Sequence, residues 1–205
     1  MARSAAASER PRLLSIEEWA DLDDEIEGEL VDGVLEEEEM ANVLHEAIVV
    51  WLSAILNAWT RRRRGLTTGS ETKIAVGPRR GRKPDLSVFL PPSLPSPADT
   101  LVRVPAHLVI EVVSPRPRDA RRDRIEKLGD YARAGARHYG IVDPQLRSLE
   151  VYELGHDGRY TVALTATRGR VRIPGCTGLV LDLDALWKEV DEIERRGAAA
   201  SRPRR

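Results

Sequence analysis

Hydrophobic residues recur at helical spacing in several segments of the chain. The longest such segment runs from Asn42 to Arg62 and carries apolar residues at Val43, Ala47, Val50, Trp51, Ala54, Ile55 and Ala58, the period of an amphipathic helix. Ser15, followed by Glu17 and Glu18, is typical of the start of a short helix. The pattern also predicts a charged helix over 119–134 and a last helix over 183–195.

Between these helices the pattern changes to short apolar runs of the kind found in strands. The segment GELVDGVLEEE (28–38) predicts a hairpin that turns at Asp32-Gly33. The runs TTGSETKIAV (67–76), PDLSVFL (84–90) and HLVIEVV (107–113) predict neighbouring strands of one sheet, and HYGIVDP and RSLEVYEL predict two more. Five prolines between 91 and 105 require an extended loop outside the sheet. The order of elements indicates a mixed α/β fold.

Length and composition favour one domain. A chain of 205 residues with 41% hydrophobic residues can form one ordinary core and hardly two. We expect a single domain over residues 13–196. Residues 1–12 and 197–205 lack hydrophobic periodicity, and we expect both to be disordered tails, the second of them basic.

Charge is balanced overall but strongly segregated along the chain. The formal net charge is −1, so bulk charge does not indicate a nucleic-acid partner. Residues 15–46 nevertheless contain fourteen acids and no Lys or Arg, whereas residues 61–83 contain nine Lys or Arg and one acid. A phosphate backbone would be attracted to the basic segment and repelled by Glu36 to Glu39, unless that acidic run points elsewhere.

Cysteine and histidine content limits the compartment and the metal chemistry. The single Cys176 cannot form an internal disulfide, which favours a reducing compartment and therefore the cytoplasm. With one Cys and four scattered His, no closed Cys/His zinc site is expected, so a metal would be bound mainly by carboxylates. The longest apolar stretch, 47–59, falls short of the roughly 18 residues of a membrane span, and no membrane association is expected.

Two carboxylates stand where strands should be apolar. Asp85 follows Pro84 at the entry of the run LSVFL, and Glu111 interrupts the run LVIEVV. Burying an unpaired carboxylate costs several kcal/mol, so such acids usually have a cation or a hydrogen-bonding partner. Two of them on adjacent strands would suit one magnesium ion. Alternatively, Glu111 lies on a half-solvated strand face and Asp85 is a turn or strand-entry residue.

A lysine and a histidine complete the candidate residues. Asp123, Lys127 and Tyr131 follow one another at intervals of four, so Lys127 lies beside the packed side of its predicted helix. The alternative is an ordinary ion pair on a solvated helix. His45-Glu46 begins like a zinc-protease motif, but Val49 stands where the second His is required. This favours a helix-face residue at His45, and the sequence leaves open whether His45 has a functional role.

The assembled pattern resembles the Uma family of restriction endonucleases, within the PD-(D/E)XK nuclease superfamily. The residues that carry the resemblance occur in a fixed order: GELVDG (28–33), His45, PDLSV (84–88), IEVVSP (110–115), the spaced Asp123, Lys127 and Tyr131, then YARAG and YGIVDP ending at Pro144. The resemblance spans residues 14–186, nearly the whole body of the chain.

The resemblance implies a restriction-endonuclease-like core, in which a mixed sheet is flanked by helices, preceded here by an N-terminal helix and hairpin. It implies a divalent cation, Mg²⁺ or Mn²⁺, bound by Asp85, Glu111 and the backbone carbonyl of Val112, with Glu29 of the hairpin as a further catalytic acid. The usual lysine two residues after the glutamate is replaced by Val113, and Lys127 is the matching substitute. Gly28 and Gly140 stand where the family has aromatic residues.

The expected function is therefore a magnesium-dependent endonuclease that hydrolyses phosphodiester bonds of DNA, with RNA not excluded. A homodimer is expected because the two-fold symmetry of a dimer matches that of duplex DNA. Two alternatives stay open at this point. The first is a catalytically inactive nuclease fold that binds nucleic acid or a protein partner, and the second is an interaction protein that uses the acidic run Glu36 to Glu39.

Overall fold

A six-stranded mixed sheet forms the centre of the protein. The computed structural model describes residues 12–23, 26, 28–36, 41–116 and 121–200. The strand order is β10-β9-β8-β7-β6-β3. These strands are β3 (Leu66–Thr68), β6 (Leu86–Phe89), β7 (Leu108–Val112), β8 (His138–Asp143), β9 (Ser148–Leu154) and β10 (Tyr160–Ala166).

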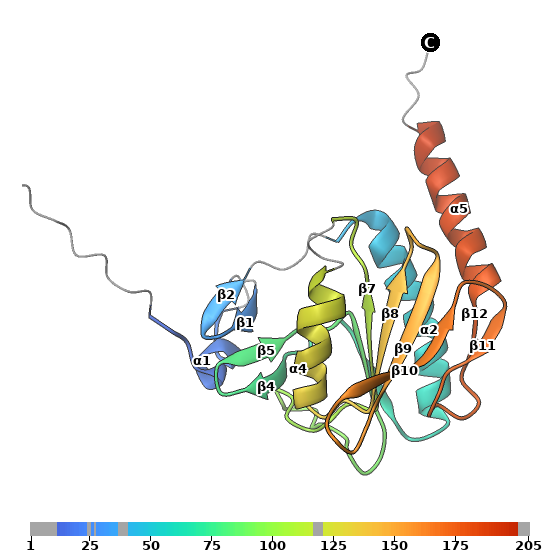
Figure 1. Cartoon of the computed structure of the whole chain (residues 1–205). Coiled ribbons are helices and arrows are strands. Elements are labelled where there is room, and N and C mark those ends of the chain that lie inside the picture. The colour runs from blue at the N-terminus through green and yellow to red at the C-terminus, as the bar shows by residue number, and fades with distance from the viewer. Residues whose placement is uncertain (1–11, 24–25, 27, 37–40, 117–120, 201–205) are drawn as a thin grey trace, which may run out of the picture.

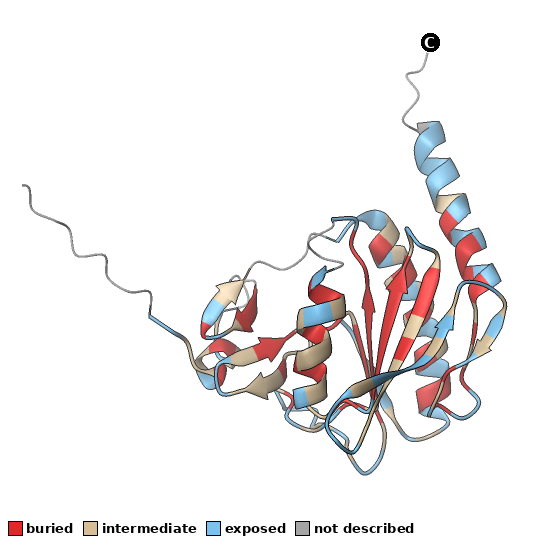
Figure 2. Ribbon diagram, in the orientation of Figure 1, coloured by how far each residue is buried: buried red, intermediate tan, exposed pale blue. Residues whose placement is uncertain are grey.

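The two central strands are the most buried part of this sheet. β7 and β8 are parallel, with Glu111 opposite Ile141, whereas the other pairs in the sheet are antiparallel. Every residue of both strands is buried, and Figure 2 shows them as the red centre of the ribbon. Parallel strands that are covered on both faces consist of continuous apolar runs in the sequence. The polar Glu111 is conspicuous because it interrupts such a run.

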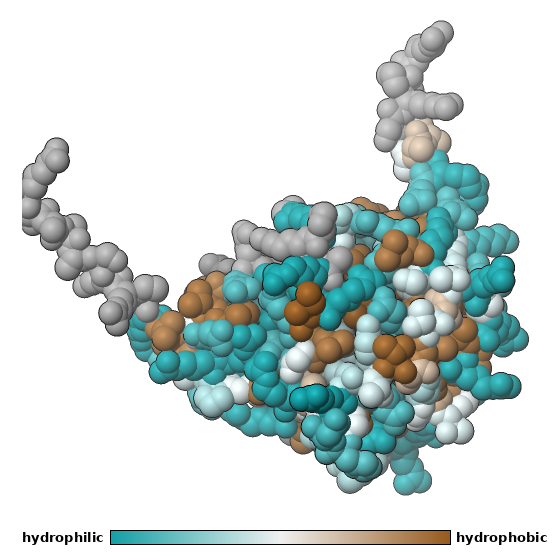
Figure 3. Space-filling model, viewed as in Figure 1, coloured by the Kyte–Doolittle hydropathy of each residue, from teal (hydrophilic) through white to brown (hydrophobic). Residues whose placement is uncertain are grey.

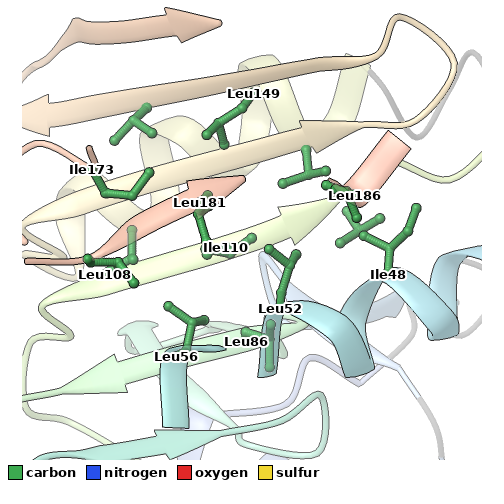
Figure 4. Packing of buried hydrophobic residues seen from close by; sticks show 14 of the residues in the cluster. Ile48, Leu52, Leu56, Leu86, Leu108, Ile110, Leu149, Ile173, Leu181 and Leu186 are labelled. Carbon is green, nitrogen blue, oxygen red and sulfur yellow. The ribbon is translucent and has the colours of Figure 1, made fainter. Parts of the chain in front are cut away.

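Helices cover both faces of the sheet. Figure 1 shows α4 (Leu128–Arg133) on the near side of the sheet and α2 (Val43–Arg61) behind it, with α5 (Leu183–Ala200) beside α2. The α2 face is filled by alternate strand residues, including Leu86, Leu108 and Ile110. Figure 4 shows Ile48, Leu52 and Leu56 of α2 pointing at these strands. The opposite face holds the other set of strand residues, including Val109, Val113 and Tyr139, with Tyr131 of α4.

The sequence of α2 explains where the helix begins and why it packs against the sheet. The Asn42 side chain caps the helix by accepting the His45 N–H at 2.9 Å. By length and apolar composition alone α2 is able to cross a membrane. Its Ile48, Leu52 and Leu56 are nevertheless buried against the sheet, which is how the core helix of a globular domain is placed.

A smaller four-stranded sheet carries the N-terminal part of the chain. Its order is β2-β1-β5-β4, formed by β1 (Glu29–Val31), β2 (Val34–Glu36), β4 (Ile74–Gly77) and β5 (Arg80–Arg82). The hairpin turns at Asp32 and Gly33, whose φ angles of 51° and 85° are those of a tight two-residue turn. α1 (Ile16–Ala20) precedes it and has the expected Ser15 cap, reciprocated by Glu18.

The helical segment that faces the catalytic candidates begins with a π-helical stretch, η1 (Arg122–Lys127), and continues as α4. In a regular α-helix, residues four apart drift by about 40° around the axis. A π-helical turn holds more residues, so the drift from Asp123 to Lys127 is reversed. As a result Asp123, Lys127 and Tyr131 all point into the protein and are buried.

The expected fold class is confirmed, with differences in detail. The run TTGSETKIAV is not one strand, because Gly69 and Ser70 interrupt it and β3 and β4 belong to different sheets. β5 was not expected, because the Arg-rich sequence RGR has no apolar signal. α5 continues to Ala200, so the first four residues of the predicted C-terminal tail are helical, as the high helix propensity of alanine favours. A two-stranded sheet of β11 (Arg170–Arg172) and β12 (Val180–Asp182) precedes α5.

Parts of three expectations lie outside the described residues. These are the tail segments 1–11 and 201–205, the start of the charged helix at Asp119, and Glu37 to Glu39 of the acidic run.

The face of the molecule in Figure 3 is mostly hydrophilic, with hydrophobic patches scattered over it. On the viewed side, the apolar side chains do not gather into one continuous band.

Candidate active site

Glu111 lies on the face of the sheet that packs against α4, where two side chains of the facing helical segment hold it. It is 2% exposed, because side chains alternate along β7 and Glu111 points with Val109 and Val113 toward α4. The Tyr131 hydroxyl donates a hydrogen bond to Glu111 Oε1 at 2.5 Å, and Lys127 Nζ lies 3.2 Å from Glu111 Oε2. The interpretation of Glu111 as an acid on a half-solvated face is therefore wrong.

Asp85 immediately precedes β6, as a strand-entry residue, and reaches across to β7. Its Oδ2 accepts the backbone N–H of Val112 at 2.7 Å and lies 3.2 Å from His45 Nε2. The N–H of Val113 bonds to Val142 on the β8 side, so the peptide groups of Val112 face the β6 side, where Asp85 stands. One backbone segment thus connects the two acids, and its Val112 carbonyl faces the same side.

Lys127 lies between two buried acids. Its Nζ is 3.3 Å from Asp123 Oδ1 as well as 3.2 Å from Glu111 Oε2, and its side chain is 6% exposed. The Tyr139 hydroxyl donates to the Asp123 carbonyl at 3.1 Å, which fastens the helical segment to β8. Lys127 is therefore not on a solvated helix face, and its ion pair with Asp123 sets its position beside Glu111.

Glu29 of the hairpin, in the smaller sheet, lines the same cavity as Asp85, Glu111 and Lys127. Arg82 Nη1 donates to Glu29 Oε2 at 2.6 Å, and the Lys83 N–H donates to Oε1 at 3.0 Å. Arg82 is fully buried and also donates through Nε to Asp130 Oδ2 at 2.7 Å. This buried guanidinium joins β1, β5 and α4.

The four predicted residues line one cavity of about 170 Å³. Asp85, Glu111, Lys127 and Glu29 come from four separate parts of the chain, and the structure brings all of them together here. The other charged or ionisable residues that line the cavity are His45, Glu46, Glu71, Lys83 and Arg122. Acids outnumber basic groups around the cavity, which makes it attractive to a cation.

Electrostatics within this group favour a bound cation. Burial raises the pKa of Glu111 well above its ordinary value; Lys127 opposes this shift, and the neighbouring Asp85 and Asp123 add to it. Burial likewise raises the pKa of Asp123. Burial alone would raise the pKa of Glu29, but the charges of Lys127 and Arg82 outweigh it, so that pKa is lowered. Burial thus makes the ionised forms of Glu111 and Asp123 costly, and a cation bound beside Glu111 would offset that cost.

The residues present fit a hard divalent cation. The donors are carboxylate oxygens and a backbone carbonyl, which Mg²⁺ and Ca²⁺ prefer. Both carboxylate oxygens of the fully buried Asp123 accept no hydrogen bond within the part of the chain that the structure describes, although Lys127 forms an ion pair with one of them. Asp85 and Glu111 would hold the ion, with the Val112 carbonyl as a third donor.

Sequence reasoning missed three features of this site. His45 was interpreted as a helix-face residue, yet it is buried, lines the cavity and contacts Asp85. Its pKa is raised because the bond to Asp85 and the charges of Asp85 and Glu46 outweigh the effect of burial. The contacts of Tyr131 with Glu111 and of Arg82 with Glu29 were also not foreseen. Spacing gave a signal for Tyr131, but nothing in the sequence marked Arg82.

The two departures from the family pattern have local explanations. Gly28 has a φ of +138°, and a Cβ there would lie 2.8 Å from the Glu36 carbonyl oxygen, so this backbone leaves no place for an aromatic residue. Gly140 in β8 lies opposite Ile110, and a Cβ there would lie 3.3 Å from the Ile110 side chain. Both departures concern packing and leave the charged groups in place.

The buried Arg82 leads to a stability prediction. Arg82→Met removes the guanidinium and leaves Glu29 and Asp130 buried with less compensation. We expect a loss of about 3 kcal/mol in the free energy of unfolding, because breaking a buried ion pair by removing one partner leaves an uncompensated charge. Urea unfolding followed by circular dichroism measures the loss.

A surface pair supplies the matched control. Arg103→Met removes an ion pair with Glu17 in which both side chains are more than half exposed, and a pair so open to solvent contributes little to stability. Adding Glu29→Gln to Arg82→Met should recover part of the loss, because the acid no longer lacks its partner. Equal unfolding midpoints for the two single variants would contradict the prediction.

Comparisons with known proteins agree with this geometry. The profile of the Uma2 family, described as "Putative restriction endonuclease", matches residues 15–184. A solved structure from Anabaena variabilis ATCC 29413, described as "a putative nuclease belonging to DUF820", is similar with a TM-score of 0.71 and 18% sequence identity. The similarity covers 86% of this chain and 99% of that chain. No curated protein matches the chain.

The family match includes every one of the four residues around the cavity and the sheet and helices that position them. The solved nuclease, at its low sequence identity, supports the fold and not the individual site residues. The match covers well over half of the sequence, and the chain belongs to the Uma2 family of restriction-endonuclease-like proteins.

Proposed function

We propose that the protein is a magnesium-dependent endonuclease that hydrolyses phosphodiester bonds of DNA. One observation carries the proposal. Two acids and a lysine that are separated in the sequence, Asp85, Glu111 and Lys127, line one small cavity, with Lys127 Nζ 3.2 Å from Glu111 Oε2. Membership in a family described as restriction endonucleases supports the same reaction class.

The chemistry divides between the cation and the side chains. A divalent cation held by Asp85, Glu111 and the Val112 carbonyl would lower the pKa of a bound water and neutralise charge on the phosphate oxygens. Lys127, fixed beside Glu111 and Asp123, places a positive charge where negative charge develops in the transition state. Both oxygens of Glu29 already accept hydrogen bonds, so Glu29 acts through its charge and by positioning neighbouring groups.

Basic residues near the cavity are suited to hold the DNA backbone. Lys83 and Arg122 line the cavity, whereas Arg61 to Arg64 lie at the opposite end of α2 from His45. α2 has 19 residues, which corresponds to about 28 Å. The basic run is therefore too far from His45 to hold the phosphate that lies in the cavity. Glu36 is paired with Arg122 at 3.0 Å, which moderates the repulsion that this acid exerts on phosphates.

The assembly that we propose is a homodimer in the cytoplasm. Two active sites related by two-fold symmetry match the two strands of a duplex. A single buried Cys176 without a disulfide partner is compatible with a reducing compartment. Size-exclusion chromatography with light scattering distinguishes a dimer from a monomer, and a monomer at the concentrations used for cleavage would overturn this part of the proposal.

Metal dependence is the first test of the reaction. Purified protein is incubated with supercoiled DNA, linear DNA and RNA, in chelator and after addition of Mg²⁺ or Mn²⁺. We expect cleavage of DNA only with a divalent cation, because in the proposed reaction the cation lowers the pKa of the attacking water. Cleavage that persists in excess chelator would contradict the proposal.

The same samples separate cleavage from simple binding. A gel-shift assay with the same DNA in chelator measures binding without turnover. DNA bound but left intact under every metal condition would indicate an inactive nuclease fold that binds nucleic acid. Cleavage of RNA with intact DNA would retain the reaction and change the substrate.

A further inference from the structure

A second cluster of metal-ligand side chains lies at the other end of the central strands. His107 immediately precedes β7, His138 begins β8, and Cys176 lies in the loop between β11 and β12. One ligand atom from each residue lies within 4.8 Å of the other two. The sequence indicated no closed site of four Cys and His ligands, but folding brings three of them together.

The His138 ring is oriented as the ring of a metal ligand is. Its Nδ1 lies 3.1 Å from the His107 carbonyl oxygen. A proton on Nδ1 donated to that carbonyl leaves Nε2 with a lone pair, which is the second-shell arrangement that metal-binding histidines use. His138 is 1% exposed, and its Nε2 has no hydrogen-bond partner among the residues described. Glu153 Oε1 is 4.0 Å away and is held by Arg137 at 3.0 Å.

The backbone around Cys176 leaves room for this ring. Gly175 has a φ of +66°, and a Cβ added there would lie 2.1 Å from His138 Cε1. Only glycine therefore lets the loop approach the imidazole so closely. Cys176 itself is a free, buried thiol. The loop is also fastened to α2, because Trp59 Nε1 donates to the Thr177 carbonyl at 3.1 Å.

His107 supplies the third candidate ligand. Its Nε2 is buried and lacks a hydrogen-bond partner in the described part of the chain. Its ring stacks on Trp59 at a centroid distance of 6.2 Å and lies 5.3 Å from the His138 ring. Burial lowers the pKa of both imidazoles, which favours the neutral form that binds metals. Burial raises the pKa of the Cys176 thiol, so metal binding there would release its proton.

We propose that His107, His138 and Cys176 bind one zinc ion, whose fourth ligand is a water molecule. Two imidazole nitrogens and one sulfur form a donor set of the borderline-soft kind that zinc prefers and magnesium does not. Tetrahedral zinc with the usual bond lengths places its ligand atoms about 3.3 to 3.6 Å apart. The ligand atoms now lie within 4.8 Å of one another, so binding would draw the three side chains closer together.

The position of the ion defines its role. It would join the starts of β7 and β8 to the β11–β12 loop, and so fix a segment that is remote in sequence to the central sheet. Glu111 comes four positions after His107, which corresponds to about 13 Å along an extended strand. The zinc ion is therefore a structural ion, separate from the cavity lined by Glu111. This inference does not depend on the proposed nuclease activity.

Cobalt is a suitable probe for the sulfur ligand. The full chain is freed of metal with a chelator and titrated with Co²⁺, whose bond to a thiolate gives a charge-transfer absorption. We expect this absorption to saturate at one ion per chain and to disappear when Zn²⁺ is added. Glu111→Gln and His156→Ala should leave it unchanged, because Glu111 lies in the other cavity and His156 is an exposed histidine outside the cluster.

Two variants decide the assignment. Cys176→Ser should remove the charge-transfer absorption and weaken Zn²⁺ binding at least 10-fold. We expect Zn²⁺ to raise the melting temperature of the wild type and not that of this variant. If Cys176→Ser does not fold, His107→Gln should weaken Zn²⁺ binding in the same way. A folded wild type without cobalt–thiolate absorption, or absorption that persists in Cys176→Ser, would overturn the proposal.

Discussion

Glu111→Gln is expected to lower metal-dependent DNA cleavage by at least about 10³-fold, the largest effect of any single substitution that the structure suggests. The substitution keeps the size of the side chain and its acceptor for the Tyr131 hydroxyl, which now donates to Glu111 Oε1 at 2.5 Å. It removes the negative charge that, in the proposed mechanism, would bind the cation. Losing several kcal/mol of transition-state stabilisation corresponds to this factor, since each 1.36 kcal/mol is worth tenfold in rate.

The fold of this variant should be intact. Burial raises the pKa of Glu111, so the ionised carboxylate is itself costly to bury and its replacement by a neutral amide removes that cost. We expect a melting temperature within about 5 °C of the wild type. Initial rates on supercoiled DNA at saturating Mg²⁺, together with thermal unfolding of the same preparation, separate lost chemistry from lost structure.

A carboxylate of the same sheet provides the control. Glu153 lies in β9, and its exposed side chain pairs with Arg137 at 3.0 Å, away from the cavity. Glu153→Gln should retain wild-type cleavage. Equal residual cleavage in both variants would identify the activity as contamination and would remove the role proposed for Glu111.

The sequence was most informative where local chemistry decides the structure. The Asp32-Gly33 turn, the Ser15 cap and the apolar period of α2 each depend on residues near one another, and all three are as expected. The strand at Arg80–Arg82 could not be predicted in this way. Arg82 is buried only because Glu29 and Asp130, from distant segments, compensate its charge.

The site shows the same division between local and distant effects. Asp85 at the entry of one apolar run and Glu111 within another indicated acids that need a partner. The identity of the partners depended on tertiary structure. The π-helical stretch turns Lys127 toward Glu111, and nothing in the spacing of the sequence indicated this turn. His45 and the cluster of His107, His138 and Cys176 likewise become close only in the folded chain.

Lys127→Met is expected to lower kcat by about 10² to 10⁴-fold while Mg²⁺ binding is retained or becomes tighter. The substitution preserves most of the length of the side chain and removes the charge that lies 3.2 Å from Glu111 Oε2. A positive charge that acts on the transition state contributes to rate and not to cation binding. Without it the cavity is more negative, which favours the cation. Cleavage rates at saturating metal and Mg²⁺ titrations of the same protein measure the two effects separately.

Val113 stands in this chain where the superfamily has its lysine. The cleavage rate of Lys127→Met therefore shows whether Lys127, from the facing helix, performs the role of that lysine. Lys188→Met, which removes an exposed lysine of α5, should leave both cleavage and metal binding unchanged. Lys127→Arg keeps the charge but spreads it over a planar group, and partial activity is expected because the ion pair with Asp123 can still form. A folded Lys127→Met variant with wild-type kcat would show that Lys127 only neutralises Glu111 and Asp123, and the chemistry would then have to come from the cation alone.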